Sequence, residues 1–198
     1  MLKKIYLIRH GETEYNRNKK IQGWLDIPLN ETGHAQARVV AEKLKGVKVH
    51  AIYASDQIRA KETAGYIAAL HRQDVIIAPE VREHKLGVFE GWGWEDKSPE
   101  LNVLWNELME SMENPEHADW QKHQGESIRE FRTRVKKFLD MVEVKHPDEV
   151  IIVVTHGGTI RRFLEVLELK ELGGDENTKN TQVITITQVD GRYTLEAD

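Results

Sequence analysis

The stretch Leu7–Thr13, which reads Leu-Ile-Arg-His-Gly-Glu-Thr, decides the predicted fold. It places an arginine, a histidine and a glycine (residues 9–11) where a strand ends, because Ile5 and Tyr6 just before it are side chains typical of strands. In an open α/β sheet, ligands bind where the strands end and the chain turns into a helix. We therefore expect a guanidinium and an imidazole at a ligand-binding edge of a sheet.

A second predicted strand ends in the same way. Residues 150–154 read Val-Ile-Ile-Val-Val, a continuous apolar run that indicates a strand buried on both faces. His156-Gly157-Gly158 follows after one threonine, and a helix is expected to begin there. Glycine lets the backbone approach a ligand closely, and the N–H groups at a helix N-terminus favour an anion. Two His-Gly strand ends are therefore expected at the same edge.

Strands and helices alternate along the rest of the chain. Strands are predicted over 3–9, 49–54, 75–78 and 150–154, a hairpin over 181–189 and 192–195, and helices over 32–45, 55–70, 127–145 and 157–169. Residues 16–30 are predicted as a loop, with Thr32 and Ser55-Asp56 as helix caps. This alternation predicts an α/β fold, a three-layer α/β/α sandwich with a mostly parallel mixed sheet.

One part of the chain interrupts this alternation. Residues 80–124 hold Gly87, Gly91 and Gly93 together with four of the five tryptophans, and a helical stripe of apolar residues lies among them. We interpret residues 88–124 as a small helical cap excursion within a single domain of residues 1–198. Trp92 and Trp94 are expected to pack inside this cap.

The composition excludes several classes of protein. A length of 198 residues fits one domain, and a net charge of −5 provides no basic field for nucleic acid. No apolar run approaches the roughly 20 residues of a membrane helix, and the sequence begins with no signal-peptide pattern. The chain has no cysteine, so thiolate chemistry is excluded. We expect a cytoplasmic protein without nucleic-acid or membrane partners.

The residue types at the predicted edge indicate a site for a tetrahedral anion. The guanidinium of Arg9 can form bidentate hydrogen bonds with a phosphate. Arg59 lies one turn into the helix after the second strand, within reach of the same edge. Glu83 follows the third strand, and a carboxyl group beside a phosphate is a candidate general acid. The pattern indicates phosphoryl transfer through a covalent intermediate on His10. It requires no metal and no cofactor, because the arginines supply the positive charge.

At these positions the sequence resembles the histidine phosphatase superfamily, the fold of cofactor-dependent phosphoglycerate mutases and their phosphatase relatives. The resemblance covers nearly the whole chain and rests on six ordered motifs. These are Arg9-His10-Gly11-Glu12-Thr13 with Asn16, Gln22-Gly23-Trp24 with Thr32-Gly33, Tyr53-Ala54-Ser55 with Arg59-Ala60, Glu83 with Gly87 and Glu90-Gly91, Gly125-Glu126-Ser127, and His156-Gly157-Gly158.

The resemblance implies a role for each site residue. His10 would be the phosphorylated nucleophile and Glu83 the proton donor, while Arg9, Arg59 and His156 would hold the phosphate. Further hydrogen bonds to the phosphate would come from Asn16, Gln22, Gly23 and the Gly157 backbone. The implied activity is a metal-independent phosphatase of a small phosphomonoester. A homodimer is an open alternative to the monomer.

Three rival functions remain open from the sequence. A phosphoglycerate mutase has the same chemistry, but it needs cations for a doubly anionic substrate. The predicted cap is acidic instead, with Glu95, Asp96, Glu100, Glu107, Glu110, Glu113, Glu116 and Asp119 against a single Lys97. This balance favours hydrolysis of an ester whose remainder is neutral, apolar or cationic. The other rivals are an inactive phosphoanion-binding protein and a zinc site formed by His10, His156 and Glu83, which the two arginines would disfavour.

The remaining histidines are predicted to be surface or packing residues. None has a partner in the motifs, and they are His34, His50, His71, His84, His117, His123 and His146.

Overall fold

The computed structural model describes residues 1–93, 98–113, 123–169 and 178–196, and of Leu101 and residues 108–113 it describes the backbone only. Within these residues, six strands form one mixed sheet in the order β3-β2-β4-β1-β5-β6. The strands are β1 (Lys4–Arg9), β2 (Ala51–Ala54), β3 (Val75–Ile77), β4 (Val150–Thr155), β5 (Val183–Val189) and β6 (Arg192–Leu195). Strands β1 to β4 pair in parallel, and β5 and β6 add an antiparallel hairpin beside β1.

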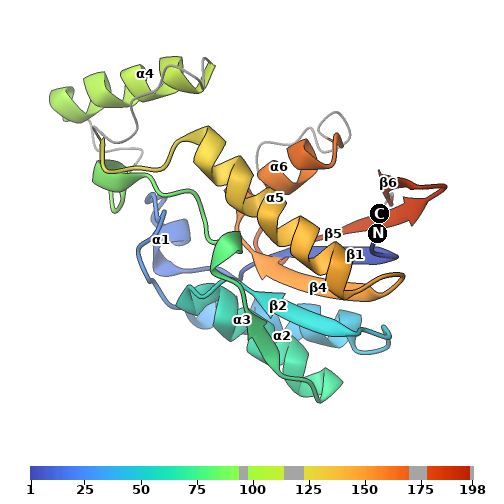
Figure 1. Cartoon of the computed structure of the whole chain (residues 1–198). Coiled ribbons are helices and arrows are strands. Elements are labelled where there is room, and N and C mark those ends of the chain that lie inside the picture. Colours follow the sequence, from blue (N-terminus) through green and yellow to red (C-terminus); the bar gives the residue numbers. More distant parts are fainter. Residues whose placement is uncertain (94–97, 114–122, 170–177, 197–198) are drawn as a thin grey trace.

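Helices cover both faces of this sheet (Figure 1). The helices α2 (Glu31–Leu44) and α3 (Ile58–His71) pack on each other at one face, and α5 (Ile128–Lys145) and α6 (Gly157–Val166) pack on each other at the opposite face. Successive strand residues alternate between the two cores, as Val153 joins the α5 and α6 side and Val154 the α2 and α3 side. The predicted three-layer sandwich is confirmed.

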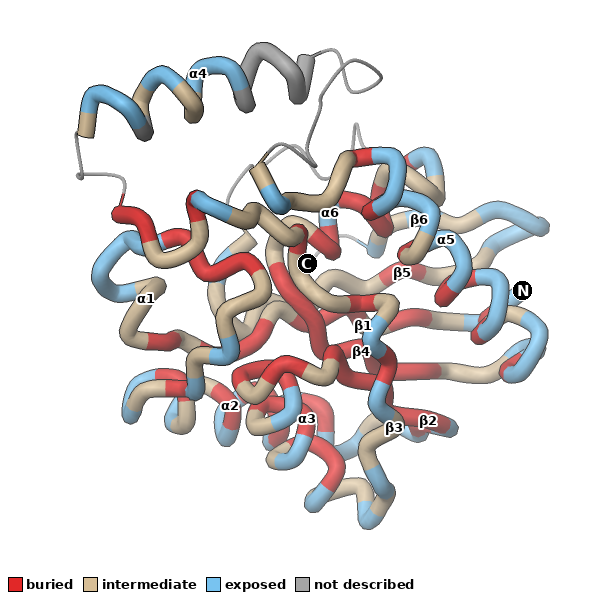
Figure 2. The backbone as a smooth tube through the Cα atoms, turned by 60° about the vertical axis from the view of Figure 1, so that its left-hand side comes forward, coloured by how far each residue is buried: buried red, intermediate tan, exposed pale blue. Residues whose placement is uncertain are grey.

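Burial is concentrated at the centre of the sheet. Figure 2 shows the buried residues along β1, β4 and the inward faces of the helices. The residues of β4 from Ile151 to Thr155 are all buried, as expected for a strand covered on both faces. The carboxyl ends of β1 and β4 therefore open onto the same rigid edge.

The predicted cap region contains a helix outside the three layers. Helix α4 (Pro99–Glu113) lies beyond the sheet on the same side as the short helix α1 (Glu14–Arg17), as Figures 1 and 2 both show. Its Leu104 and Trp105 pack against a small cluster that includes Phe89 and Trp92. The ring centroids of Trp92 and Trp105 are 5.6 Å apart, which agrees with the predicted packing role of Trp92.

Several cap predictions fall outside the described residues. They concern Trp94, Glu95, Asp96, Lys97, Glu116, His117, Asp119 and Trp120. Glu100 and Glu107 are described and are exposed to solvent. The single domain with a cap over residues 88–124 stays a prediction.

The predicted starts of two helices were wrong. Asn30, not Thr32, caps α2, because its side chain accepts a hydrogen bond from the Gly33 N–H. Gln57 is the N-cap of α3, and it caps without its side chain. Asp56 does not cap α3, since its carboxylate pairs with Arg82 instead.

The predicted loop over residues 16–30 begins inside a helix. Thr13 starts α1 with a capping box completed by Asn16. Two further one-turn helices, η1 (Pro79–Val81) and η2 (Gly87–Phe89), lie between β3 and α4. Helix α6 ends at Val166, three residues before the predicted end.

Candidate active site

Parallel pairing of β1 with β4 brings the two predicted site histidines together. Arg9 lies opposite Thr155 in the register, so His10 and His156 follow at the same level of the edge. Their ring centroids are 5.2 Å apart, and both side chains are buried, His10 at 2% and His156 at 0% exposure. The sequence prediction that both His-Gly strand ends share one edge is confirmed.

The His10 ring is held in one tautomer. Its Nδ1 lies 2.7 Å from the Gly11 carbonyl oxygen, which can only accept, so Nδ1 carries the proton. The lone pair is then on Nε2. Burial, followed by the charges of Arg59 and Arg9, holds the pKa of His10 well below its ordinary value of 6.5. The result is a neutral imidazole whose unprotonated nitrogen is Nε2.

Gly11 lets the chain turn beneath His10. A Cβ at this position would lie 2.6 Å from the Gly33 carbonyl oxygen, too close for any side chain. The Gly11 N–H donates to Thr63 Oγ1 over 3.0 Å, and the same hydroxyl donates to the Arg59 carbonyl. Thr63 therefore joins the His10 turn to the helix that carries Arg59.

Both terminal nitrogens of Arg59 donate hydrogen bonds to carbonyl groups of a loop. Its side chain is fully buried, and it donates to the carbonyl oxygens of Leu25 (2.7 Å) and Gly23 (2.9 Å). Its Nε is buried without a partner among the described residues. Burial lowers the pKa of Arg59 from 12.5 to about 10, so the group is still a cation at neutral pH.

Arg9 and His156 add further buried donors. One Nη of Arg9 donates to the Thr178 carbonyl, while its Nε is buried and unpartnered within the described part of the chain. Both ring nitrogens of His156 are likewise buried without a described partner. Burial first, and then the charge of Arg59, lowers the pKa of His156 well below 6.5. Unpaired buried N–H groups are rare, and here they converge at one edge.

Glu83 lies at the N-terminus of α6, between the other site residues. Its Oε2 accepts from the Gly158 N–H over 3.1 Å, and its Oε1 accepts from the His84 N–H over 2.8 Å. A Cβ on Gly158 would overlap with Oε1, so this glycine is required by the close approach of the carboxylate. Burial lowers the pKa of both Arg9 and Arg59, and the charge of Glu83 opposes this lowering, which agrees with its position beside them.

The other predicted phosphate ligands lie around this centre. The amide oxygens of Asn16 and Gln22 both accept from Thr13 Oγ1, over 3.1 and 2.9 Å. Gly23 has a φ of +49°, which favours glycine, and its carbonyl faces Arg59. A Cβ at Gly157 would lie 3.9 Å from the Arg9 side chain, so its backbone borders that guanidinium.

Comparison with known proteins identifies the family. The family model of the histidine phosphatase superfamily (branch 1) matches residues 5–197. The chain belongs to this superfamily. Phosphoglycerate mutase-like protein 4 of Arabidopsis thaliana is 38% identical over 81% of this chain and 69% of its own length.

Two phosphoserine phosphatases are also similar. The metal-independent phosphoserine phosphatase of Arabidopsis thaliana is 35% identical over 85% of this chain and 71% of its own. A solved structure of an Entamoeba histolytica phosphoserine phosphatase mutant, in complex with phosphoserine, has a TM-score of 0.80 and 29% identity. That alignment covers 100% of this chain and 96% of the other. These findings confirm the predicted enzyme, a phosphatase of the histidine phosphatase superfamily, in preference to the mutase.

The histidine phosphatase edge contains two residues that the motifs did not single out. Gln57 donates to the Gly23 carbonyl and accepts from the Glu83 N–H, so it joins the two loops. Asn180 donates to the His10 carbonyl over 3.0 Å. Only their polar side chains in buried segments could have indicated them.

The zinc alternative has no support in the geometry. Among the described residues, which include His10, Glu83 and His156, no three histidine, aspartate or glutamate side chains gather in a way that could hold a metal ion.

No helix of the described part of the chain has the length and apolar character to cross a membrane.

Proposed function

We propose that this phosphatase hydrolyses a small phosphomonoester through a phosphohistidine at His10. Nε2 of His10 attacks phosphorus and the ester P–O bond breaks. The carboxyl group of Glu83 gives its proton to the departing alkoxide. The same carboxylate then takes a proton from water, whose oxygen attacks the phosphohistidine and releases inorganic phosphate. Glu83 ends protonated and His10 free, so the cycle closes.

The observation that carries this proposal is the set of buried, unpartnered donors. The Nε groups of Arg9 and Arg59 and the ring of His156 have no described acceptor. A phosphoryl group provides several anionic oxygens, and donors already oriented toward it stabilise the charge that develops during transfer. A neutral carbonyl or hydroxyl ligand would leave two arginine charges without compensation. The site therefore suits a phosphate oxyanion.

The substrate class follows from the relatives and the surface near the site. The similar phosphoserine phosphatases make O-phosphoserine the first compound to test. Its remainder carries an ammonium group and a carboxylate group and so has no net charge, and the described acidic residues of α4, Glu100 and Glu107, are exposed. We propose an ester whose remainder is cationic or neutral, in agreement with the acidic composition of this region. A cytoplasmic location and a homodimer stay predictions.

A substrate panel with covalent trapping tests the function. Wild type and His10→Ala are compared on O-phosphoserine, 3-phosphoglycerate, neutral sugar phosphates and p-nitrophenyl phosphate, and the enzyme, quenched in denaturant at alkaline pH because phosphohistidine is acid-labile, is examined by mass spectrometry. We expect turnover and a phosphoryl adduct on the His10 peptide in wild type only. Turnover that survives in His10→Ala contradicts the mechanism. Preference for 3-phosphoglycerate over every other ester contradicts the substrate class.

A further inference from the structure

The segment that carries Glu83 has no regular secondary structure. Between η1 and η2, residues 82–86 belong to no strand or helix, and they are partly or fully buried. The carbonyl groups of this segment therefore need hydrogen-bond donors from other elements. Side chains from other elements provide them: Thr155 donates to the Val81 carbonyl, Thr159 to the Arg82 carbonyl and Trp24 to the Glu83 carbonyl.

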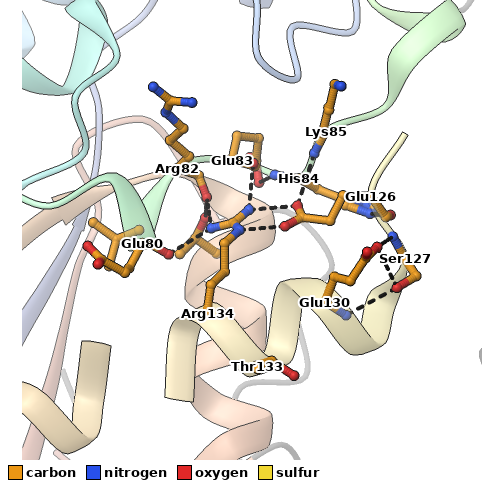
Figure 3. A network of polar contacts seen from close by, with 12 residues as sticks. Glu80, Arg82, Glu83, His84, Lys85, Glu126, Ser127, Glu130, Thr133 and Arg134 are labelled. Carbon is orange, nitrogen blue, oxygen red and sulfur yellow. Dashed lines mark hydrogen bonds and ion pairs between the residues drawn. The ribbon is translucent and has the colours of Figure 1, made fainter. Parts of the chain in front are cut away.

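Arg134 of α5 provides more of these hydrogen bonds than any of those residues. Figure 3 shows its guanidinium at the centre of the network, directed at the backbone of residues 80–83. It donates to the carbonyl oxygens of Glu80 and Arg82, each over 2.7 Å, and of Glu83 over 2.8 Å. One side chain thus donates hydrogen bonds to three backbone carbonyl groups at and just before Glu83.

Glu126 holds Arg134 in that orientation. Its two carboxylate oxygens accept from Nε (2.6 Å) and Nη2 (2.8 Å) of Arg134, a bidentate pair with both side chains mostly buried. Glu126 also contacts the far side of the segment, where its carboxylate accepts from the Lys85 N–H and its backbone carbonyl from the His84 ring. The segment is therefore held both before and after Glu83.

The hydrogen-bond inventory separates Arg134 from the two phosphate-site arginines. A guanidinium has five N–H donors, and the five hydrogen bonds of Arg134 occupy all of them. Arg9 and Arg59 each keep a buried Nε without a described partner. Arg134 therefore has no donor for a substrate, although its charge is among those that lower the pKa of His156.

We propose that Arg134, oriented by Glu126, is a positioning residue for the reaction: it fixes the backbone at Glu83 so that the carboxyl group meets the leaving oxygen. This inference rests on the proposed role of Glu83 as proton donor. Lysine cannot replace Arg134, because an ammonium group has three donors at one point and no planar fork. Displacement of a catalytic group by about 1 Å costs on the order of 10²-fold in rate.

Leaving-group dependence is the measurement that distinguishes positioning from a merely structural role. Phenyl phosphate and p-nitrophenyl phosphate are similar in size, but only the phenolate of the first needs a proton to depart. The kcat/KM values report the steps through phosphoryl transfer to His10. For Arg134→Lys, we expect kcat/KM on phenyl phosphate to fall about tenfold more than on p-nitrophenyl phosphate. The matched control is Arg132→Lys on the same helix, an exposed arginine paired with Glu165, which should leave the ratio unchanged.

Two further variants, Glu83→Gln and Glu126→Gln, distinguish a failure of the inference about Arg134 from a failure of the proposed role of Glu83. Glu83→Gln must lower the phenyl phosphate value selectively; if it does not, the proposed function of Glu83 fails. If Glu83→Gln shows this selectivity while Arg134→Lys slows both esters equally, the inference about Arg134 is overturned. Should Arg134→Lys fail to fold, as judged by circular dichroism, Glu126→Gln replaces it. That variant loses the carboxylate charge that orients the guanidinium, and it is expected to show the same selectivity at smaller size.

Discussion

His10 and His156 occupy equivalent places in the structure and have different surroundings. Each follows one of two paired parallel strands, each precedes a glycine, and each is buried. The His10 ring is hydrogen-bonded by its own turn, so one nitrogen is protonated and the other has a lone pair. The His156 ring has no described hydrogen bond at either nitrogen. In the proposed mechanism, the same dipeptide therefore provides the nucleophile in one place and a phosphate donor in the other.

The difference arises from the elements that follow the two strands. After Gly11 the chain turns closely under Gly33 before it enters the short helix α1, and the His10 ring folds back onto the Gly11 carbonyl. After His156 the helix α6 begins at once, so the backbone at Gly157 and Gly158 is already helical, and the Gly158 N–H donates to Glu83. The surroundings of the two histidine rings therefore depend on the backbone geometry that follows each strand, and not on the His-Gly dipeptide that both share.

The largest effect should separate the two histidines by covalent trapping. His10→Ala is expected to lower kcat/KM by at least about 10⁴-fold and to remove the phosphoryl adduct. His156→Ala removes one oxyanion donor and should cost about 10²–10³-fold, with the adduct still formed on the His10 peptide. Rapid-quench mass spectrometry of both variants, checked for folding, measures this. An adduct on the His156 peptide would reverse the assignment.

A smaller effect should separate the two glycines of α6. Gly158→Ala places a Cβ against Glu83 Oε1, so the carboxylate must move, and we expect kcat/KM on phenyl phosphate to fall about tenfold. Gly157→Ala adds only an ordinary contact 3.9 Å from Arg9 and should cost at most about threefold. Both variants keep the helical backbone. Equal losses in steady-state assays would mean that the close approach of Glu83 does not matter for catalysis.

The smallest effect concerns stability against pH. The unfolded chain takes up protons at histidine near pH 6.5, whereas the buried rings of His10 and His156 have lowered pKa values and resist protonation. The stability that these neutral rings contribute is therefore fully present above pH 6.5 and is lost as the pH falls toward their folded pKa values. Each ring can cost up to about 1.4 kcal/mol per pH unit in that window.

Thermal unfolding of the substrate-free enzyme at pH 7.5 and pH 5.5 measures this loss. One kcal/mol corresponds to about 2–4 °C in Tm for a chain of this size. His84 is a third buried histidine whose pKa burial lowers, so His156→Asn removes one of three such rings and should reduce the drop in Tm. A drop as large as that of wild type would contradict the assignment of the pH dependence to His156.

The sequence predicts the site best where the signal is local. The apolar run before His156 and the strand before His10 place both rings at one edge without further information. The positions of Arg59 and Glu83 followed from their places after strands and from the family resemblance. In contrast, Gln57 as the start of α3 could not be predicted, because the carboxylate of Asp56 pairs with Arg82, 26 residues later in the chain. Asn30 caps α2 through a local hydrogen bond from the Gly33 N–H, and this start was predicted two residues too late.

Long-range contacts account for what the sequence did not reveal about the site itself. The hydrogen bonds of Arg59 to the carbonyl groups of Gly23 and Leu25 depend on a loop that is placed by tertiary packing. The network of Arg134 likewise joins α5 to a segment some 50 residues earlier in the chain, and the bond to Glu83 spans a sequence separation of 51. An arginine on an amphipathic helix carries no local sign of such partners.

The parallel pairing of β1 with β4 also determines when activity can first arise during folding. These two strands are far apart in the sequence, and β4 pairs with β2 on its other side. Non-local parallel pairing forms slowly, because a long loop must close before its contacts stabilise the chain. His10 and His156 meet only when that pairing is complete. The rate at which phosphatase turnover recovers after dilution from denaturant therefore reports the rate at which β1 pairs with β4. Chains that have not yet formed this pairing release no phosphate.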